Sequence, residues 1–372
     1  MILRNRPVSS IMNIAFYITN HGYGHASRNV PIICTLLRKN PEIRVFIKSD
    51  KERCEFLRRN FAFYGMDVPF IEQRIEYYYD VSEIGLVLKP GTMETDSALM
   101  KNEVLADYTK WQYYIERERK FLTDKEINIV VADIVAWALK AAKEVGIPCL
   151  LIGNFSWAQM YRQFYGDEFV KPYVECYSCA TKAVWYRIHS FELETYCDSN
   201  VNVSLGSRRM DRERAEAIKA AHSRPIVFVS LGASADLKDN IDVSHLPYDF
   251  ITTRGVHFVG DNVYELPLDT VNTPDYIEAS EYVIAKGGWS TVAEILLRRK
   301  KCALLLRGSN PEDDNTKREL MSCGYCIALD GSELKNIGQL IDRIEELQPG
   351  TYEEFTDDND RICEIILQML RR

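Results

Sequence analysis

The stretch Ile11–Leu37, IMNIAFYITNHGYGHASRNVPIICTLL, decides the fold of this chain. It opens with an apolar run short enough for one buried strand, and Asn20 then turns the chain. Gly22 and Gly24 permit a tight turn that brings backbone amides close to a ligand. The apolar residues that follow recur at helical spacing: Val30, Ile33, Cys34 and Leu37. The order strand, turn, helix places His25 at the carboxyl edge of a sheet, where open α/β sheets bind ligands.

Length, composition and charge limit the classes of protein to which this chain can belong. The 372 residues predict two domains, and 46% hydrophobic residues suffice for two cores. A net charge of -8 with scattered Lys and Arg argues against a nucleic-acid partner. The basic run 207–214, SRRMDRER, is expected to be a solvated helix surface. No apolar run reaches the roughly 18 residues of a transmembrane helix, so we expect a cytoplasmic protein, with peripheral attachment to a membrane left open.

Ten cysteines are spread through the chain, mostly within apolar segments. We expect them to be reduced core residues. Two pairs have CxxC spacing, Cys176/Cys179 and Cys323/Cys326, but they lie in different halves of the chain and have no histidine at zinc-finger spacing. A metal site is therefore not expected, and neither is a redox role.

The first half alternates strands and helices. IRVFIKS (43–49) and VPFIEQ (68–73) are expected to be the second and third strands of a parallel sheet. INIVVAD then ends in Asp133, which places this carboxylate on the same edge as His25. The next strand, CLLIGN, ends in Asn154, and Trp157 follows. Many aromatic residues lie between 77 and 121; they form either core or a platform for stacking on sugar rings.

A second α/β sheet is expected after residue 206. The predicted domains are 1–206 and 207–350, with a last helix from about Thr351 to Leu370 packing back on the first domain. Phosphate-binding turns are predicted after two of its strands, where small residues or a helix N-terminus expose amides. The candidates are Gly232, Ala233 and Ser234 after one strand, and Lys286, Gly287, Gly288, Ser290 and Thr291 after another.

Three further polar residues of the second half are candidates for binding sugar hydroxyls. Glu294 lies one turn into the helix that starts near Ser290, where a carboxylate can accept from a ribose. Asp314 and Asn315 are expected just before a helix that begins near Thr316, at the same sheet edge. Helix capping is the alternative for Asp314 and Asn315, and for Glu294 the alternative is a solvated glutamate in a helix that Ser290 caps. The chain contains no nucleotide P-loop pattern.

Taken together, these motifs resemble glycosyltransferases of the GT-B architecture, which have two Rossmann-like domains facing across a cleft. The resemblance spans the GYGH turn, the VAD strand end, the SLG turn, GGWSTVAE and EDDN. Family 1 transferases and the bacterial enzyme that adds N-acetylglucosamine to a lipid-linked cell-wall precursor are similar. HGYGHASR and NFSW also resemble the transferase-like half of plant arabinokinases.

The resemblance implies a role for each matching residue. His25 matches the general base for the acceptor hydroxyl, and Asp133 matches the aspartate that orients it. The two small-residue turns, together with Gly24, match contacts to a nucleotide diphosphate, with UDP or TDP expected. Glu294 matches a ribose ligand. Asp314 and Asn315 match a pair that contacts the donor sugar, although glutamine is usual where Asn315 stands. Asn154 and Trp157 are candidates for the acceptor side.

The implied reaction is an inverting, metal-independent transfer from a nucleotide diphosphate sugar, without a cofactor. Imidazole is suited to activate a hydroxyl near neutral pH, and helix amides can stabilise the departing diphosphate. The acceptor stays open between a carbohydrate and a lipid-linked molecule. One alternative is a module that binds nucleotide sugars without catalysis. Another is an NAD-dependent enzyme, with Gly22, Gly24 and Asp50 as a partial dinucleotide fingerprint.

Overall fold

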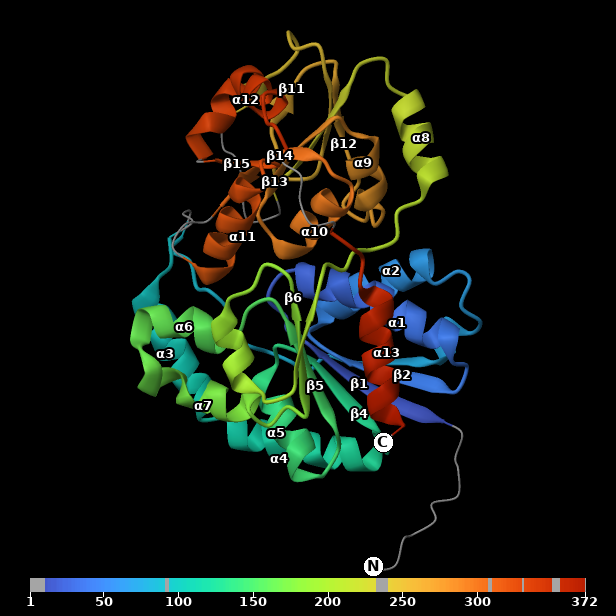
Figure 1. The fold of residues 1–372 in the computed structure, drawn as a ribbon, viewed down its shortest axis with the longest axis vertical. Helices are drawn as coiled ribbons and strands as arrows, with labels where there is room; N and C mark the ends of the chain where they lie inside the picture. The colour runs from blue at the N-terminus through green and yellow to red at the C-terminus, as the bar shows by residue number, and fades with distance from the viewer. Residues whose placement is uncertain are drawn as a thin grey trace, which may run out of the picture. The chain divides into compact units, whose positions relative to one another are not determined.

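The computed structural model describes residues 11–90, 94–231, 240–306, 310–329, 331–349 and 355–371. Two compact units are present, and Figure 1 shows the elements of both. The first consists of Met1–Val203 with Asp358–Arg372, and the second of Ser204–Asp357. The first unit therefore ends close to the expected boundary at residue 206 and takes up the last helix.

The first unit is built on a seven-stranded parallel sheet with the order β3-β2-β1-β4-β5-β6-β7. This is the Rossmann order, in which the chain reverses its direction of growth between β1 and β4. Residue 18 of β1 pairs with residue 133 of β4, so the carboxyl ends of these two strands lie side by side. The strands are β1 (Met12–Ile18), β2 (Ile43–Lys48), β3 (Ile75–Tyr78), β4 (Ile129–Asp133), β5 (Cys149–Gly153), β6 (Lys182–Tyr186) and β7 (Asn200–Val203).

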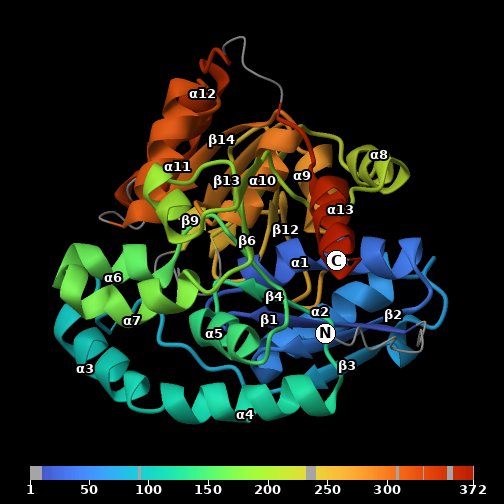
Figure 2. The same ribbon diagram turned by 60° about the horizontal axis from the view of Figure 1, so that its bottom comes forward.

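Helices cover both faces of this sheet (Figures 1 and 2). One face carries α1 (Gly24–Lys39), α2 (Lys51–Tyr64) and α13 (Asn359–Leu370). The other carries α3 (Ser97–Tyr108), α4 (Trp111–Asp124), α5 (Ala136–Glu144), α6 (Trp157–Tyr165) and α7 (Asp167–Tyr177), with a 3-10 helix η2 (Phe191–Tyr196) before β7. Period-two alternation in β1 explains the two layers, because Ala15 and Tyr17 join the aromatic core under α4 to α7.

The last helix packs on α1. Cys363 Sγ lies 3.4 Å from the carbonyl oxygen of Ile32, and Lys39 pairs with Asp360 at 2.9 Å. α13 begins at Asn359, later than the expected start near Thr351, and residues 350–354 lie outside the described chain.

The expected third strand over residues 68–73 is wrong. That segment forms a turn and the 3-10 helix η1 (Ile71–Gln73), and β3 begins only at Ile75. Pro69 has no N–H to donate to a strand ladder, and Phe70 adopts a left-handed backbone with φ of 54°. The apolar composition of VPFIEQ therefore indicated a strand that its backbone cannot form.

The second unit repeats the plan, with a parallel sheet in the order β12-β10-β8-β13-β14-β15. Its direction of growth reverses between β8 and β13, again a Rossmann order. The strands are β8 (Ile226–Ser230), β10 (Asp249–Thr252), β12 (Val263–Glu265), β13 (Tyr282–Lys286), β14 (Lys301–Leu305) and β15 (Cys326–Leu329), and β9 (Ile241–Asp242) pairs with β11 (Phe258–Val259) in a small separate sheet. The helices are α8 (Arg212–Ala220), α9 (Thr273–Ala279), α10 (Trp289–Leu297), α11 (Pro311–Ser322) and α12 (Ile337–Glu345), with η3 (Gly331–Asn336) before α12.

Among the described residues, no helix has both the length and the apolar character that crossing a bilayer requires.

Candidate functional site

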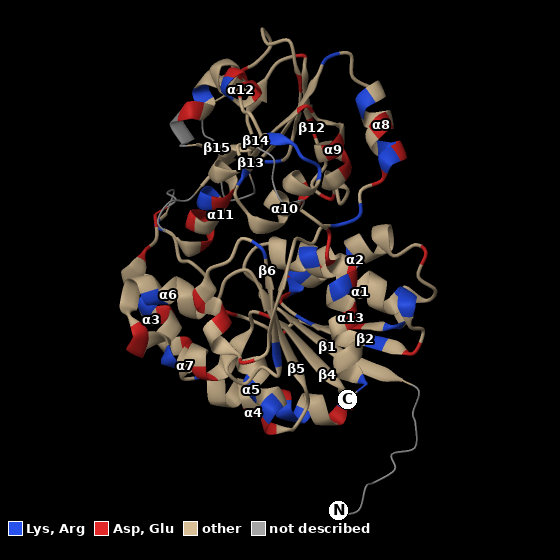
Figure 3. Cartoon of the chain, in the orientation of Figure 1, with Lys and Arg blue, Asp and Glu red and all other residues tan. Residues whose placement is uncertain are grey.

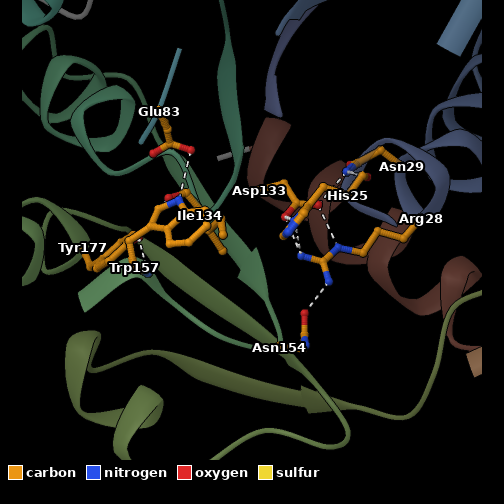
Figure 4. Close-up of polar contacts among 9 residues, drawn as sticks. All are labelled: His25, Arg28, Asn29, Glu83, Asp133, Ile134, Asn154, Trp157 and Tyr177. Carbon is orange, nitrogen blue, oxygen red and sulfur yellow. Dashed lines mark hydrogen bonds and ion pairs between the residues drawn. The ribbon is translucent and has the colours of Figure 1, made fainter. Parts of the chain in front are cut away.

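His25 and Asp133 meet where β1 and β4 end. His25 is the second residue of α1, and Asp133 is the last residue of β4. The imidazole Nδ1 lies 2.7 Å from Asp133 Oδ1 (Figure 4). Both residues are buried, with 6% of His25 and 1% of Asp133 exposed. Pairing of residues 18 and 133 across the two strands explains why two side chains so far apart in sequence come together.

Asp133 also binds two residues that the sequence analysis missed. Arg28 Nε donates to Asp133 Oδ2 over 2.8 Å, and a terminal nitrogen of the same guanidinium, Nη2, donates to Oδ1 over 2.5 Å. Asn29 Nδ2 donates to Oδ2 over 2.7 Å. Arg28 and Asn29 follow His25 at i+3 and i+4, so they share its face of α1. That spacing in HASRN was the sequence signal that could have identified them.

Asp133 is ionised in this setting. Burial by itself raises the pKa of a carboxyl group, but the positive charge of Arg28 and the hydrogen bonds from Arg28 and His25 hold the pKa of Asp133 well below its usual range. A bidentate guanidinium and an amide donor leave this carboxylate fully hydrogen-bonded. The site therefore contains a fixed negative charge beside the histidine, together with its positive partner.

The contacts favour one tautomer of His25. Nδ1 lies 2.7 Å from Asp133 Oδ1 and 2.9 Å from Arg28 Nη2, and one nitrogen cannot donate to the first while it accepts from the second. An ionised carboxylate can only accept, whereas Nη2 of Arg28 already donates to that same carboxylate oxygen. The proton on Nδ1 therefore satisfies both neighbours, and Nε2 keeps the lone pair that a base needs.

Asn154, a predicted acceptor contact, directly follows β5 and is linked to the site through Arg28. Its amide oxygen accepts a hydrogen bond of 2.6 Å from Arg28 Nη1 (Figure 4). The guanidinium of Arg28 also stands 5.2 Å above the ring of Tyr186 on β6. Side chains from α1, β4, β6 and the end of β5 thus form one connected group around His25.

Trp157, the second predicted acceptor contact, is the first residue of α6 and has no exposed surface. Its Nε1–H donates to Glu83 Oε2 over 3.2 Å (Figure 4). Its ring meets Phe155 edge-on at 5.4 Å, and Phe155 meets His25 in the same way at 5.4 Å. Trp157 therefore contacts the histidine through Phe155 rather than directly.

Glu83 is a second buried carboxyl group, and the sequence analysis did not select it. It follows β3 and is 6% exposed. Burial raises its pKa to about 8, against smaller lowering effects of Thr19 and Trp157. Among the described residues its second oxygen, Oε1, makes no hydrogen bond of normal geometry. Glu83 is therefore largely protonated at neutral pH.

The predicted diphosphate turn of the second unit lies between β13 and α10. Lys286 ends β13, Gly288 caps α10, and Ser290 and Thr291 occupy its first turn. A Cβ atom on Gly287 would lie 2.4 Å from the Cδ2 atom of Leu306, so a larger residue at this position would require the Leu306 side chain to shift. The first amides of α10 point away from the helix body, as an anion site requires. Gly232, Ala233 and Ser234 lie outside the described residues.

Glu294, the predicted ribose ligand, is 2% exposed and pairs with Arg208. Arg208 Nε donates to one carboxylate oxygen over 3.0 Å, and its Nη2 lies 3.4 Å from the other. Arg208 also binds the carbonyl of Val271 and the hydroxyl of Thr273, each over 2.7 Å. Only 8% of Arg208 is exposed, so the expectation of a solvated surface for 207–214 is wrong at this residue. The helix α8 starts after it, at Arg212, and carries both basic and acidic side chains (Figure 3).

Asp314 and Asn315 lie inside α11, not before it as expected. The helix begins at Pro311 because Asn310 caps it, with its side chain accepting from the amide of Asp313 over 2.9 Å. Asp314 is exposed, whereas Asn315 is buried. Asn315 Oδ1 accepts from Arg318, and within the described chain its Nδ2 has no partner. Asn315 therefore has a donor available for a ligand.

The alternative of a dinucleotide enzyme named Asp50 as a ribose ligand. In the structure Asp50 caps α2, accepting from the amide of Arg53 over 2.8 Å. Its carboxylate also pairs with the side chain of Arg53 at 3.1 Å.

Comparison of the sequence with known proteins found one curated relative and no matching family model. The L-arabinokinase of Arabidopsis thaliana is 24% identical over 302 residues. The match covers 76% of this chain but only 27% of that much longer protein.

Solved structures with the same fold are more numerous. A UDP-glucosyltransferase from Polygonum tinctorium, in a complex with 3,4-dichloroaniline, superposes with a TM-score of 0.60 at 11% identity, over 97% of this chain and 99% of that one. The glycosyltransferase SsfS6 of Streptomyces sp. SF2575, in a complex with thymidine diphosphate, gives 0.54 at 12% identity, over 96% and 99%. The chain therefore has the GT-B fold of these glycosyltransferases, with two Rossmann-like units.

Proposed function

We propose that this protein is a glycosyltransferase that moves a sugar from a nucleotide diphosphate sugar to an acceptor hydroxyl. The observation that carries the proposal is the buried His25–Asp133 pair at the switch point of the first sheet. Switch points are where open α/β sheets bind ligands, and a histidine oriented by a carboxylate is a general base. The fold shared with solved glycosyltransferases supports this choice of reaction.

His25 would act on the acceptor. Its Nε2 takes the proton of the acceptor hydroxyl while that oxygen forms a bond to the anomeric carbon of the donor. The bond between this carbon and the diphosphate oxygen breaks, and its electron pair leaves with the nucleoside diphosphate. Attack from the face opposite the leaving group inverts the anomeric configuration. Asp133 stabilises the imidazolium through Nδ1–H, as its 2.7 Å contact allows.

The donor would bind at the carboxyl edge of the second sheet. Amides at the start of α10, with the hydroxyls of Ser290 and Thr291 and the cation of Lys286, suit the charge of a departing diphosphate. These groups would supply the stabilisation without a metal ion. The side-chain Nδ2 of Asn315, which has no partner among the described residues, supports a contact to a hydroxyl of the transferred sugar.

The donor nucleotide that we propose is UDP or TDP, because the structural neighbours include a UDP-glucosyltransferase and a complex with thymidine diphosphate. Glu294 would reach the ribose only if it shares its carboxylate with Arg208, whose guanidinium contacts both oxygens. The acceptor is a hydroxyl compound of the carbohydrate or lipid-linked class.

Thermal unfolding with nucleotides tests the donor site first. The full chain is heated with UDP, TDP, GDP or NAD, each at a hundredfold excess over its dissociation constant and without metal. A ligand at that excess stabilises the folded state by about 2.7 kcal/mol. We expect a rise in Tm with UDP or TDP and none with NAD. A rise with NAD alone would overturn the proposal.

Transfer itself is then tested by mass spectrometry, with the matching nucleotide sugar and a panel of sugar and lipid-linked acceptors. A product heavier by one glycosyl residue, formed together with free nucleoside diphosphate, supports the enzyme. Donor binding with neither transfer nor donor hydrolysis would favour a module that binds nucleotide sugars without catalysis.

A further inference from the structure

We infer that Arg28 is a positioning residue of the catalytic pair, which holds Asp133 in place and offsets its charge beside His25. This inference rests on the proposed function only in the role given to His25. In Figure 4, Arg28 is linked by dashed lines to both Asp133 and Asn154. It binds both oxygens of Asp133 through its fork, and it binds Asn154 through its remaining terminal nitrogen.

Burial and geometry make Arg28 a fixed charge rather than a substrate contact. Only 2% of it is exposed, and its guanidinium is held from β4, from the end of β5 and over the Tyr186 ring. A guanidinium that donates in parallel to both carboxylate oxygens allows one orientation of the carboxylate. Asp133 therefore presents Oδ1 to His25 in a single geometry, without rotating.

The charges around the imidazole decide its protonation before the reaction. Asp133 faces it from β4, Arg28 from α1, and the apolar Phe155 from the segment after β5. An unneutralised carboxylate would favour the charged imidazolium, which cannot accept a proton. Arg28 adds the opposite charge 2.9 Å from Nδ1 and so favours the neutral base.

A purely structural role makes a different prediction. A buried carboxylate needs a cation for stability alone, and loss of Arg28 would then lower Tm without changing the titration of His25. If Arg28 also sets the protonation of His25, a neutral replacement must make the imidazole easier to protonate. The two roles are therefore separated by a titration and not by stability.

The experiment compares Arg28→Met and Arg28→Gln, which are neutral, with Arg28→Lys, which keeps the charge but loses the fork. Arg38→Met is the matched control, because Arg38 lies on the same helix and pairs with Asp67 through the same two-pronged contact, at 2.9 Å for each bond, on the exposed surface. NMR of 13C-labelled histidine gives the titration midpoint of His25 without a substrate. His25→Gln assigns its signal among the six histidines.

We expect the midpoint of His25 to rise by about one pH unit or more in Arg28→Met and in Arg28→Gln. It should stay within about 0.3 unit in Arg28→Lys and in Arg38→Met, since the first keeps the cation and the second does not touch the site. The acidic limb of kcat/KM against pH should move with the midpoint. An unchanged midpoint in whichever neutral variant folds would overturn the inference.

Failure of the proposed function is distinguishable from failure of this inference. If the wild-type chain transfers no sugar, the NMR titration still reports whether Arg28 controls the protonation of His25. If transfer occurs but neutral variants keep both the midpoint and the acidic limb, Arg28 is structural and the transferase proposal stands.

Discussion

Two buried carboxyl groups of the first unit are held in opposite states. Asp133 ends β4, and Glu83 follows β3; 1% and 6% of them are exposed. The pKa of Asp133 lies well below its usual range, whereas the pKa of Glu83 is raised to about 8. Asp133 itself contributes to the rise at Glu83 through its negative charge. One group is therefore ionised at neutral pH, and the other is largely a neutral acid.

The difference lies in their partners, not in their burial. Asp133 receives a guanidinium fork, an imidazole and an amide, while Glu83 receives one indole N–H from Trp157. Burial raises the pKa of both carboxyl groups, and at Asp133 the positive charge of Arg28 and the interaction with His25 reverse this effect. Environments that separate the pKa values of neighbouring carboxyls commonly mark a division of chemical roles. Here the ionised Asp133 contacts the imidazole of His25, and the neutral Glu83 accepts a hydrogen bond from Trp157 of α6.

Removing the charge of Asp133 should have the largest effect. Asp133→Asn keeps the shape but leaves Arg28 as a buried cation without a carboxylate, which should destabilise the fold by about 3–5 kcal/mol. Transfer should fall by roughly 10³–10⁴-fold, because an amide can donate to Nδ1 and impose the wrong tautomer on His25. Urea unfolding and kcat/KM measure the two effects. Near-normal transfer by a folded Asp133→Asn protein would contradict the assigned role.

Replacing Glu83 by a residue that is neutral at every pH should raise the stability of the fold, whereas Asp133→Asn lowers it. This gain should grow as pH rises. The pKa of Glu83 is raised in the folded state, so its contribution to stability is fully present below about pH 4.5 and is lost as pH rises through about 8. Glu83→Gln stays neutral at every pH. We expect it to match the wild type within about 1 kcal/mol at pH 5 and to be more stable by on the order of 4 kcal/mol at pH 9.

Urea unfolding at the two pH values, followed by tryptophan fluorescence, provides the measurement. Trp111, Trp137, Trp157 and Trp185 belong to the first unit, so the signal mainly follows the unit that contains Glu83. Glu103→Gln, at an exposed glutamate of α3, is the control and should show no such pH dependence. An equal stability difference at pH 5 and pH 9 would mean that Glu83 does not titrate in this range.

The smallest effect should come from the hydrogen bond that Trp157 donates to Glu83. Trp157→Phe removes the indole N–H that favours the ionised carboxylate, so the pKa of Glu83 should rise further. The resulting loss of stability, about 1 kcal/mol, should develop as pH rises above 7. Trp137→Phe is a matched control, since the buried Nε1 of Trp137 has no hydrogen-bond partner among the described residues. If stability depended on pH in the same way in both variants, the hydrogen bond from Trp157 would have no effect on the pKa of Glu83.

Much of the fold could be predicted from local sequence, because buried parallel strands and the helices between them have distinct apolar periods. The place of His25 at a sheet edge was predicted from the first strand, turn and helix, whereas the GT-B fold was predicted from the resemblance of motifs along most of the chain. The errors arose where single residues determine the backbone conformation against the preference of the segment's overall composition. Pro69 and Phe70 turn the segment expected to be the third strand. The Asn310–Pro311 pair starts α11 early, a capping signal that was present in the sequence but not used.

The site was less predictable than the fold. The roles predicted for His25, Asp133 and the donor-binding residues remain predictions, and the structure adds their partners. Arg28 could have been found from its spacing after His25 on one helix. Glu83 could not, because its partner Trp157 lies 74 residues further along the chain and only tertiary packing brings them together. Arg208 was not predicted either, because its partner Glu294 is also distant in sequence. The charged run around Arg208 indicated a solvated surface instead.

The central claim is that His25 is the base of a sugar transfer, and His25→Ala tests it most directly. His222→Ala is the control, because His222 forms a similar pair with Asp249 at 3.0 Å outside the proposed site. Donor Kd is measured by calorimetry and transfer by mass spectrometry for both variants and the wild type. We predict that His25→Ala binds donor within about twofold of the wild type but transfers about 10²–10⁴-fold more slowly, while His222→Ala keeps its activity. Equal transfer rates in His25→Ala and the wild type would contradict the account.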